Sequence, residues 1–544
     1  MPPRFRRPEP MTTFELVPDD EREDAPDDAP DDRPHESRRR PADLIVRARA
    51  RWRTLSRRGR VAVAGGTAVV VVAAATAAVA PGLLDARAER QRAEAIRGMP
   101  GVVGDLSEPV DVVWSLPEES SVAAVLPGGV LAVTDGAGVR AMDAATGDVV
   151  WEHPLDDGAM CGPAPWTPVD WSAPVDTVVC VEDASRVTVL DADGTVVSER
   201  ELDLLEPVDA PGEGDPGVYS WSQVVPAADG TVAVLDETAS VTEVPWPEGE
   251  DAASLLRALR DTGWHDPTLR VVDAVTGEER AEVTVPLTED ALESCGVTEG
   301  PGEQTVSVTP QPWIDATPSA TTLGVCGLTR AVTPTGGSFD VGGDAHTLVP
   351  LPGGRFLVQG ETSEVRDAHG ERLETIHGSA VAPLVDTTPD GARLVLVGAG
   401  GSASSLAALG ADGAPTWSVS VAPLTTPLAR VGDAIVLADE TSLTVVDART
   451  GAQRWRVPDL LDGDPEDGET VAGAVTDGTR LLLAISPASW SDDGADAPHR
   501  LVALDLRDGS TAWERTGTGV LWGLFSAGGT PVTLGNSLSG LGGA

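Results

Sequence analysis

The sequence predicts an all-β fold, a β-propeller, joined to one hydrophobic helix near the N-terminus. The 59 glycines and 44 prolines among 544 residues punctuate short runs rich in Val, Thr and Leu, which is typical of short strands joined by tight turns. A short motif recurs along the chain, and a single apolar run precedes every copy of it. Since single cores stop growing well below this length, a repeat architecture is favoured.

The first 60 residues are expected to be a disordered cytoplasmic tail. They contain 15 Arg and 13 Asp or Glu, with many prolines and almost nothing to bury. Arginines cluster from Arg47 to Arg60, immediately before the apolar run, and such a cluster attracts anionic lipid headgroups.

Residues 61–82 are predicted to form a transmembrane helix. Val61 to Ala80 is a run of 20 residues without a charge, long enough to cross about 30 Å of hydrocarbon. A buried core helix is the alternative, but the preceding arginines favour a span with the N-terminus in the cytoplasm. The charged region before the run is too long for a cleaved signal peptide, so we expect a retained signal anchor. Residues 83–105 would then be a stalk, and residues 106–544 an extracytoplasmic domain.

The predicted extracytoplasmic part is strongly acidic. Residues 61–544 contain 24 Arg against 73 Asp and Glu, and the chain has no Lys. Such a domain repels phosphate backbones, so nucleic acid is an unfavourable partner. The simplest interpretation of the excess of acidic residues is a solvated surface that keeps the domain soluble.

The repeat is clearest in three copies with the same internal spacing. In each copy, Trp follows Asp by eight residues and Gly by four. The copies are Asp143, Gly147 and Trp151; Asp447, Gly451 and Trp455; and Asp505, Gly509 and Trp513.

Weaker copies fill the intervals between these three. They centre on Asp191, Asp273 with Gly277, Asp367, Gly410 and, more weakly, Thr335–Gly336. Their uneven spacing indicates insertions or a degenerate unit, so we expect eight blades, with seven as the alternative. The segment Val110–Leu116 resembles an outermost strand and is expected to close the ring by pairing with the C-terminal strands.

Each copy describes a strand that ends in a tight turn and returns as the next antiparallel strand. The Asp side chain caps turn amides, the Gly supplies a positive φ, and the Trp covers the layer between adjacent units. The pattern A-x-D-x-x-T-G-x-x-x-W resembles the repeat of the PQQ-binding-like propellers. That family includes quinone-dependent alcohol dehydrogenases and an outer-membrane assembly scaffold lipoprotein, so the resemblance implies a propeller over about residues 108–544 and leaves the activity open.

Four cysteines are expected to pair if the domain faces an oxidising compartment. Three connectivities are possible, and Cys161–Cys180 with Cys295–Cys326 is favoured because each pair spans one turn between apparent neighbouring strands. Leu255, Leu256 and Leu259 lie at helical spacing within 251–260, which predicts a short helix packed on the rim, or a partner-binding helix.

No catalytic residue can be assigned from the sequence. A quinone dehydrogenase would need PQQ, a Ca²⁺ site and an Asp base, but neither an adjacent cysteine pair nor a CxxCH motif is present. The run from Gly398 to Ala403 lacks the helix of a dinucleotide site, and the acidic loop 462–469 departs from the EF-hand order. Neither a cofactor nor a metal is therefore expected, with PQQ and Ca²⁺ as alternatives.

The leading hypothesis is a non-enzymatic, membrane-tethered interaction scaffold or ligand-binding module outside the cytoplasm. The hypothesis rests on repeats whose recognisable residues are structural. It also fits the general behaviour of propellers, which bind partners through loops around the channel. A quinone-dependent oxidoreductase and an extracytoplasmic sensor are the alternatives.

Overall fold

The computed structural model describes residues 91–117, 120–204, 217–245, 252–261, 264–299, 305–309, 312–343, 347–388, 393–399, 402–410, 413–422, 424–464, 468–488 and 498–543. The chain divides into two units, 1–84 and 85–544, and every described residue belongs to the second. The predicted tail, the Arg47–Arg60 cluster and the predicted span all lie outside the described residues. Within the described part of the chain, no helix is long and apolar enough to cross a membrane.

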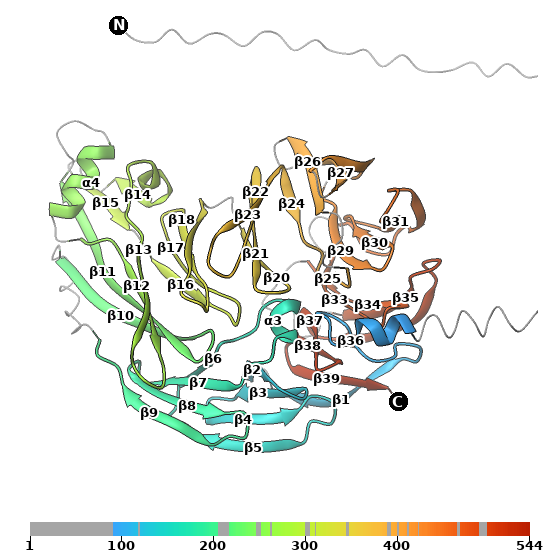
Figure 1. The fold of residues 1–544 in the computed structure, drawn as a ribbon, viewed down its shortest axis with the longest axis horizontal. Coiled ribbons are helices and arrows are strands. Elements are labelled where there is room, and N and C mark those ends of the chain that lie inside the picture. Colours follow the sequence, from blue (N-terminus) through green and yellow to red (C-terminus); the bar gives the residue numbers. More distant parts are fainter. Residues whose placement is uncertain are drawn as a thin grey trace, which may run out of the picture. The chain divides into compact units, whose positions relative to one another are not determined.

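The described strands form nine antiparallel sheets, or blades, arranged around a central channel (Figure 1). From the channel outward, blades 1 to 5 consist of β2 (Ser121–Leu126), β3 (Val130–Thr134), β4 (Gly138–Asp143) and β5 (Val149–Pro154); β6 (Met160–Gly162), β7 (Thr177–Glu182), β8 (Arg186–Asp191) and β9 (Val196–Glu201); β10 (Gly217–Ala227), β11 (Thr231–Pro245), β12 (Thr268–Asp273) and β13 (Glu279–Thr284); β16 (Trp313–Ala316), β17 (Thr321–Val325), β18 (Leu328–Val332) and β19 (Ser338–Gly342); and β20 (Thr347–Leu351), β21 (Arg355–Gln359), β22 (Thr362–Arg366) and β23 (Arg372–His377).

The second half of the ring continues in the same way. Blades 6 to 9 consist of β24 (Ser379–Val381), β26 (Arg393–Ala399), β27 (Ser402–Leu409) and β28 (Pro415–Ser420); β29 (Thr426–Val431), β30 (Ala434–Ala438), β31 (Leu443–Asp447) and β32 (Gln453–Val457); β33 (Glu469–Thr476), β34 (Arg480–Pro487), β35 (Pro498–Asp505) and β36 (Thr511–Thr518); and β37 (Leu521–Ala527), β38 (Thr530–Gly535), β39 (Leu538–Gly543) and β1 (Val110–Leu116). The short β25 (Val385–Asp386) pairs with β29 in parallel.

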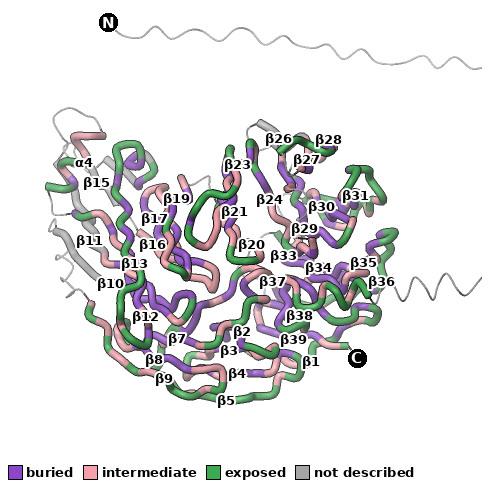
Figure 2. Tube along the Cα trace, in the orientation of Figure 1, coloured by how far each residue is buried: buried purple, intermediate pink, exposed green. Residues whose placement is uncertain are grey.

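The blades are held together by apolar layers, one between each pair of neighbours. Nine clusters of buried side chains alternate with the nine sheets around the ring. The middle strands are mostly buried, whereas outer strands such as β5 and β9 alternate between exposed and half-buried residues (Figure 2). A four-stranded sheet cannot bury both faces alone, so each blade requires its two neighbours.

The ring closes through the N-terminal strand, as the sequence predicted. β1 pairs antiparallel with β39, so the last blade takes its outermost strand from the start of the domain. This pairing removes the exposed edge that β39 would otherwise present.

The prediction of eight or seven blades was wrong, because the described residues form nine. Eight blades carry a turn between the third and fourth strand, and each turn corresponds to one copy of the motif, including the weak copy at 333–336. The ninth blade has no such turn, because its third strand, β39, pairs with β1 from the start of the domain as its fourth. Counting motif copies therefore missed the blade that joins the two ends of the domain.

The predicted Trp–Gly layer is present between the blades. At four positions, a Trp indole N–H donates to a backbone carbonyl in the turn of the next blade, and the ring covers the glycine of that turn. The pairs are Trp114 with Ala144 and Gly147, Trp151 with Ala192 and Gly194, Trp417 with Ala448 and Gly451, and Trp455 with Leu506 and Gly509.

Blade 3 carries an elaboration that the other described blades lack. β10 and β11 extend beyond the ring, and β11 pairs with a hairpin formed by β14 (Gly296–Glu299) and β15 (Thr305–Thr309). The helix α4 (Ala252–Asp261) and the 3-10 helix η1 (Asp290–Ser294) pack beside it. The predicted rim helix is thus confirmed, with Leu259 fully buried. We call α4, η1, β14 and β15 the rim module.

Candidate functional site

In the three clear copies and at Asp273, the repeat Asp is the last residue of the third strand of its blade, and the repeat Gly lies in the turn that follows. The repeat Trp of the three clear copies lies in the fourth strand. One carboxylate oxygen of Asp143 accepts hydrogen bonds from two turn amides, those of Ala145 and Thr146. Asp273 and Asp447 also accept from two turn amides each, whereas Asp505 accepts from the Arg507 amide. These carboxylates therefore stabilise the turns of the blades.

The electrostatics of these turns agree with a structural role. The Arg454 guanidinium donates to Asp447 and, with the turn hydrogen bonds, lowers the pKa of Asp447 to about 2. At Asp273, hydrogen bonds from Thr276 and Arg280 outweigh partial burial and lower the pKa of its carboxyl. Both groups are ionised at neutral pH and already paired, so neither is poised for proton transfer.

One mouth of the channel is covered by a short helix that the sequence analysis missed. Helix α3 (Pro168–Ser172) belongs to the connection between β6 and β7, and it lies at the centre of the ring near β20 and β37 (Figure 1). Its Trp171 is 3% exposed and stacks on Phe525 of β37, with ring centroids 3.3 Å apart. An element of blade 2 therefore reaches across the channel to blade 9.

Asp170 fastens this helix to a second blade. Its carboxylate accepts a hydrogen bond from the Ser319 hydroxyl in blade 4 and completes a capping box with Thr167, whose hydroxyl lies 3.0 Å away. Burial raises the pKa of Asp170, while the hydrogen bonds from Ser319 and Thr167 oppose that rise. A capping interaction of this kind contributes roughly 1 kcal/mol, and here it also sets where α3 crosses the channel.

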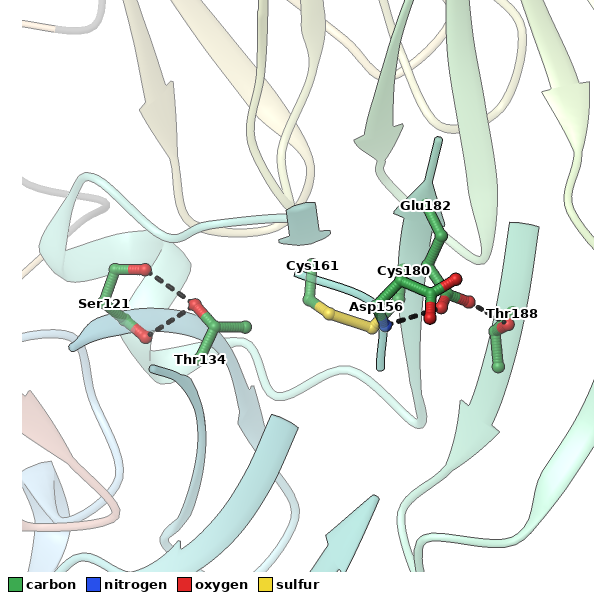
Figure 3. Close-up of a disulfide and its surroundings, with 7 residues drawn as sticks. All are labelled: Ser121, Thr134, Asp156, Cys161, Cys180, Glu182 and Thr188. Carbon is green, nitrogen blue, oxygen red and sulfur yellow. Dashed lines mark hydrogen bonds between the residues drawn. A yellow bond between two sulfur atoms is a disulfide. The ribbon is translucent and has the colours of Figure 1, made fainter. Parts of the chain in front are cut away.

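The predicted Cys161–Cys180 disulfide holds the start of the same connection. The two cysteines are directly opposite in the β6–β7 pair and are bonded to each other (Figure 3). Nearby, Glu182 accepts hydrogen bonds from the Thr188 hydroxyl and the Asp156 amide, which fixes the adjoining loop (Figure 3). The short β6 is thus pinned to its blade just before the chain leaves for the channel.

The other predicted disulfide, Cys295–Cys326, is also present. Cys295 follows η1 in the rim module, and Cys326 lies in the β17–β18 turn of blade 4. The rim module is therefore covalently tied to the ring.

The larger recess, of about 1000 Å³, lies between α3 and the segment that enters the ring from the N-terminal side. One wall is formed by residues 97–105, and the other by α3 and the first turns of blades 1, 8 and 9. Arg97 and Arg480 both line the recess, and Arg480 is paired with Asp477 and Asp105. The recess combines apolar side chains with glycine backbone and is open to solvent.

Residues 91–106 are firmly attached to the ring. Residues 91–96 are helical. The Val103 amide donates to Thr476 O at 2.8 Å, and the Leu106 carbonyl accepts from Trp513 Nε1 at 2.8 Å. Leu106 is 1% exposed. Its carbonyl takes the place of the turn that blade 9 lacks, so this part of the stalk completes the ring.

The smaller recess, of about 420 Å³, lies on the other side of α3, between blades 4 and 5. Trp166, just before α3, and Trp313 of β16 line it while remaining 68% and 48% exposed. Asp315 lies on the same strand face as Trp313, two residues along β16. Its side chain is open to water through the recess, but the surrounding protein removes enough water to raise its pKa.

The described residues do not fit PQQ and its calcium ion. No three His, Cys, Asp or Glu side chains are placed together to hold a metal ion in the part of the chain that the structure describes. The buried Arg430, near the channel, is already paired with Asp386. Helix α3 and the Trp171–Phe525 stack occupy the centre of one channel mouth. Among these residues, neither a metal-binding cluster nor an unpaired Arg430 is therefore available to hold a planar, multiply anionic cofactor.

Two features of this site escaped the sequence analysis. Helix α3 has a readable signal in Thr167-Pro168-Val169-Asp170, which is a capping box with proline at the first helical position. The exposed residues Trp166 and Trp313 have no such signal, because they are 147 positions apart in the printed sequence and line the same recess only in the folded ring.

Several solved structures resemble this chain at low sequence identity. BamB from Moraxella catarrhalis is 12% identical, with a TM-score of 0.35, and the match covers 80% of this chain and 99% of that one. Sqt1 from Saccharomyces cerevisiae is 10% identical, with a TM-score of 0.34 and coverage of 81% and 100%. The quinohemoprotein alcohol dehydrogenase ADHIIG from Pseudomonas putida HK5 is 14% identical, with a TM-score of 0.28 and coverage of 81% and 77%. No curated protein sequence matches the chain.

The family comparison concerns the second half of the ring. Residues 363–536, from blade 5 to blade 9, match the PQQ_2 family model, which is described as outer membrane protein assembly factor BamB. This segment contains two of the three clear motif copies, Asp447 to Trp455 and Asp505 to Trp513. The resemblance to PQQ-like propeller repeats that the motif predicted is therefore confirmed for residues 363–536.

Proposed function

We propose that this protein is a non-enzymatic interaction scaffold, tethered to a membrane by residues 61–82 and presenting its propeller outside the cytoplasm. The observation that carries the proposal is the rim module, a rigid addition to one side of a repetitive ring. Its helix α4 and 3-10 helix η1 share their own apolar cluster, and Cys295–Cys326 ties them to blade 4. A preordered surface of this kind lowers the entropy lost on binding a partner.

Other features support the same function. The two disulfides fit an oxidising compartment. The repeat carboxylates are engaged in turns and ion pairs, which leaves the loops of the rim and channel for recognition. The matched family is described as an outer membrane protein assembly factor, and a scaffold role is consistent with that description.

Site-specific photocrosslinking in native membranes tests the proposal. A photoreactive residue replaces Arg257, which is exposed on α4, in the full-length protein. The control position is Val150 on the outer strand β5, which is 57% exposed. We expect the same membrane or extracytoplasmic protein to be captured at position 257 in repeated preparations, and not at position 150.

Two results would contradict the scaffold function. One is a folded protein that yields no reproducible adduct at position 257. The other is stoichiometric binding of PQQ with Ca²⁺ followed by dye-coupled alcohol oxidation, which would make the channel an active site.

A further inference from the structure

We infer that the smaller recess is a binding site for a cationic side chain, arginine or lysine, presented by a protein partner. The assignment of the cation to a protein rests on the proposed scaffold function. The site itself is argued from the chemistry of the recess, namely two exposed indoles, a carboxylate without a cationic partner among the described residues, and a wall of hydroxyl groups.

The recess exists because blades 4 and 5 are not fully packed by apolar side chains. The face of blade 4 that carries Trp313 and Asp315 looks into the recess, whereas Ile314 and Ala316 pack toward blade 3. Across the same sheet, Thr322 and Thr329 line the recess. Polar residues therefore occupy an interface that is filled by aliphatic residues between blades 7 and 8.

The carboxylate of Asp315 has no cationic partner among the described residues. The ion pairs of the neighbouring strands are made elsewhere, as between Arg330 and Asp340 on β18 and β19. The lining of the recess contains no Arg or His. Partial desolvation without a counter-charge is unfavourable for a carboxylate, and a bound cation would relieve that cost.

The two indoles supply the second half of a cation site. Trp313 lies directly opposite Gly324 in the β16–β17 pair, and its indole packs over that glycine. Trp166 comes from the connection held by the Cys161–Cys180 disulfide and by Asp170, so its backbone position is fixed from both ends. Indole faces next to a carboxylate attract ammonium and guanidinium groups, with Trp the strongest of the aromatic side chains.

Size and overall charge agree with this occupant. A volume of about 420 Å³ falls in the range of roughly 300 to 1,000 Å³ typical of small-ligand sites. The excess of 73 Asp and Glu over 24 Arg in residues 61–544 also attracts basic partners and repels acidic ones. Neutral sugars could stack on the same indoles, but they would not use the charge of Asp315, and the test below separates the two.

The experiment measures binding of N-acetyl-arginine amide to the full-length protein by ligand-observed NMR and calorimetry. N-acetyl-citrulline amide is the matched neutral probe, and an N-acetylglucosamine oligomer is the sugar probe. We expect the arginine probe alone to bind, with Asp315→Asn weakening it at least tenfold and Trp166→Ala weakening it about fivefold.

Two control variants keep the test specific. Asp340→Asn removes an exposed carboxylate of the same blade that is engaged with Arg330, and Trp522→Ala removes a 45% exposed indole of blade 9. Both should bind the arginine probe with unchanged affinity. Thermal unfolding of every variant shows that the ring is intact.

Equal binding of the arginine and citrulline probes, unchanged affinity in Asp315→Asn, or binding of the sugar probe alone would overturn the inference. So would the absence of binding to folded protein at 50 mM of the arginine probe. That concentration is about tenfold above the millimolar dissociation constants expected for single-group contacts. Because the small probes do not involve the rim module, failure here leaves the crosslinking result at position 257 untouched. Failure of crosslinking at position 257 would likewise leave the probe-binding result unaffected, because binding of the probe does not depend on a partner captured at α4.

Discussion

At the scale of single residues, the ring depends on contacts between a Trp of one blade and a Gly of the next. Gly509 has a φ of +74°, and a Cβ atom built there would lie 2.6 Å from the Trp455 ring. The glycine is therefore required twice, once for the backbone conformation and once for the space that the indole fills.

Gly509→Ala should destabilise the protein by about 2 to 4 kcal/mol, because the left-handed backbone costs roughly 1 kcal/mol and the overpacked indole another 1 to 3 kcal/mol. Gly353→Ala is the matched control. Its φ is +80°, but a Cβ there meets no atom within 4 Å, so only the backbone cost remains. Thermal unfolding of the two variants gives the difference. Equal shifts in Tm would show that the indole contributes nothing to the requirement for glycine.

Asp447 links stability to pH. Its pKa is lowered to about 2, chiefly by the hydrogen bond from Arg454. A lowered carboxyl pKa contributes stability that is present above the unfolded value of 3.8 and is lost as the pH falls through about 2. The site is open to water, so screening limits this contribution to about 1 kcal/mol.

Asp447→Asn should therefore lower the Tm at pH 7, and the difference from the native protein should vanish near pH 2. The amide oxygen can still accept the turn hydrogen bonds, so the variant removes mainly the charge. Asp193→Asn changes an exposed residue in the corresponding turn of blade 2 and should have little effect at either pH. A Tm difference for Asp447→Asn that is the same at both pH values would exclude the ion pair as its cause.

At the scale of elements, connections between blades decide the shape of the channel and its recesses. Residues 101–106 are the least expected of these, because they resemble a linker in the sequence. In the structure Val102, Val103 and Leu106 are all buried, and Ser526 donates its hydroxyl to Val102 O at 2.6 Å.

Leu106→Ala in the full-length protein should cost about 2 to 5 kcal/mol, as expected for removing a fully buried leucine. Leu373→Ala is the control, since Leu373 is 56% exposed on β23 and its loss should change stability by less than about 0.5 kcal/mol. Chemical denaturation compares the two. A small effect at Leu106 would mean that the stalk is dispensable for ring closure.

The two disulfides should protect different elements. Replacing Cys295 and Cys326 by Ser should speed amide hydrogen exchange in α4 and leave α3 unchanged, because that bond joins the rim module to blade 4. Replacing Cys161 and Cys180 should do the reverse, since that bond anchors the strand before α3. Each pair serves as the control for the other, and exchange that rises across the whole ring in both would show global rather than local stabilisation.

The elements also show how far sequence reasoning extends. Local signals were sufficient for the Asp–Gly turns, for α4 and for the strand Val110–Leu116, because their chemistry lies within a few consecutive residues. The ninth blade and the smaller recess depend on residues brought together by ring closure and by α3. Trp166 and Trp313 illustrate this, since nothing near either residue in the sequence indicates the other.

At the scale of the whole molecule, charge opposes compactness. Residues 61–544 have 73 Asp and Glu against 24 Arg, so most carboxylates have no positive partner available. Ion pairs such as Arg270–Asp236 and Arg500–Glu469 are local and worth at most about 1 kcal/mol each when partly exposed. The repulsion among the remaining carboxylates acts over the full Debye length, about 30 Å at 0.01 M salt and 10 Å at 0.1 M.

Raising NaCl from 10 to 300 mM, across the range in which the Debye length contracts severalfold, should therefore raise the Tm by a few degrees at pH 7. Salt weakens the ion pairs as well, but the unpaired carboxylates outnumber the arginines, so relief of repulsion dominates. Repeating the scan near pH 4 provides the control, because protonation of carboxylates reduces the net charge and should shrink the salt effect. A Tm that falls with salt at pH 7 would mean that the arginine ion pairs between strands, and not the excess of carboxylates, govern the electrostatic stability of the ring.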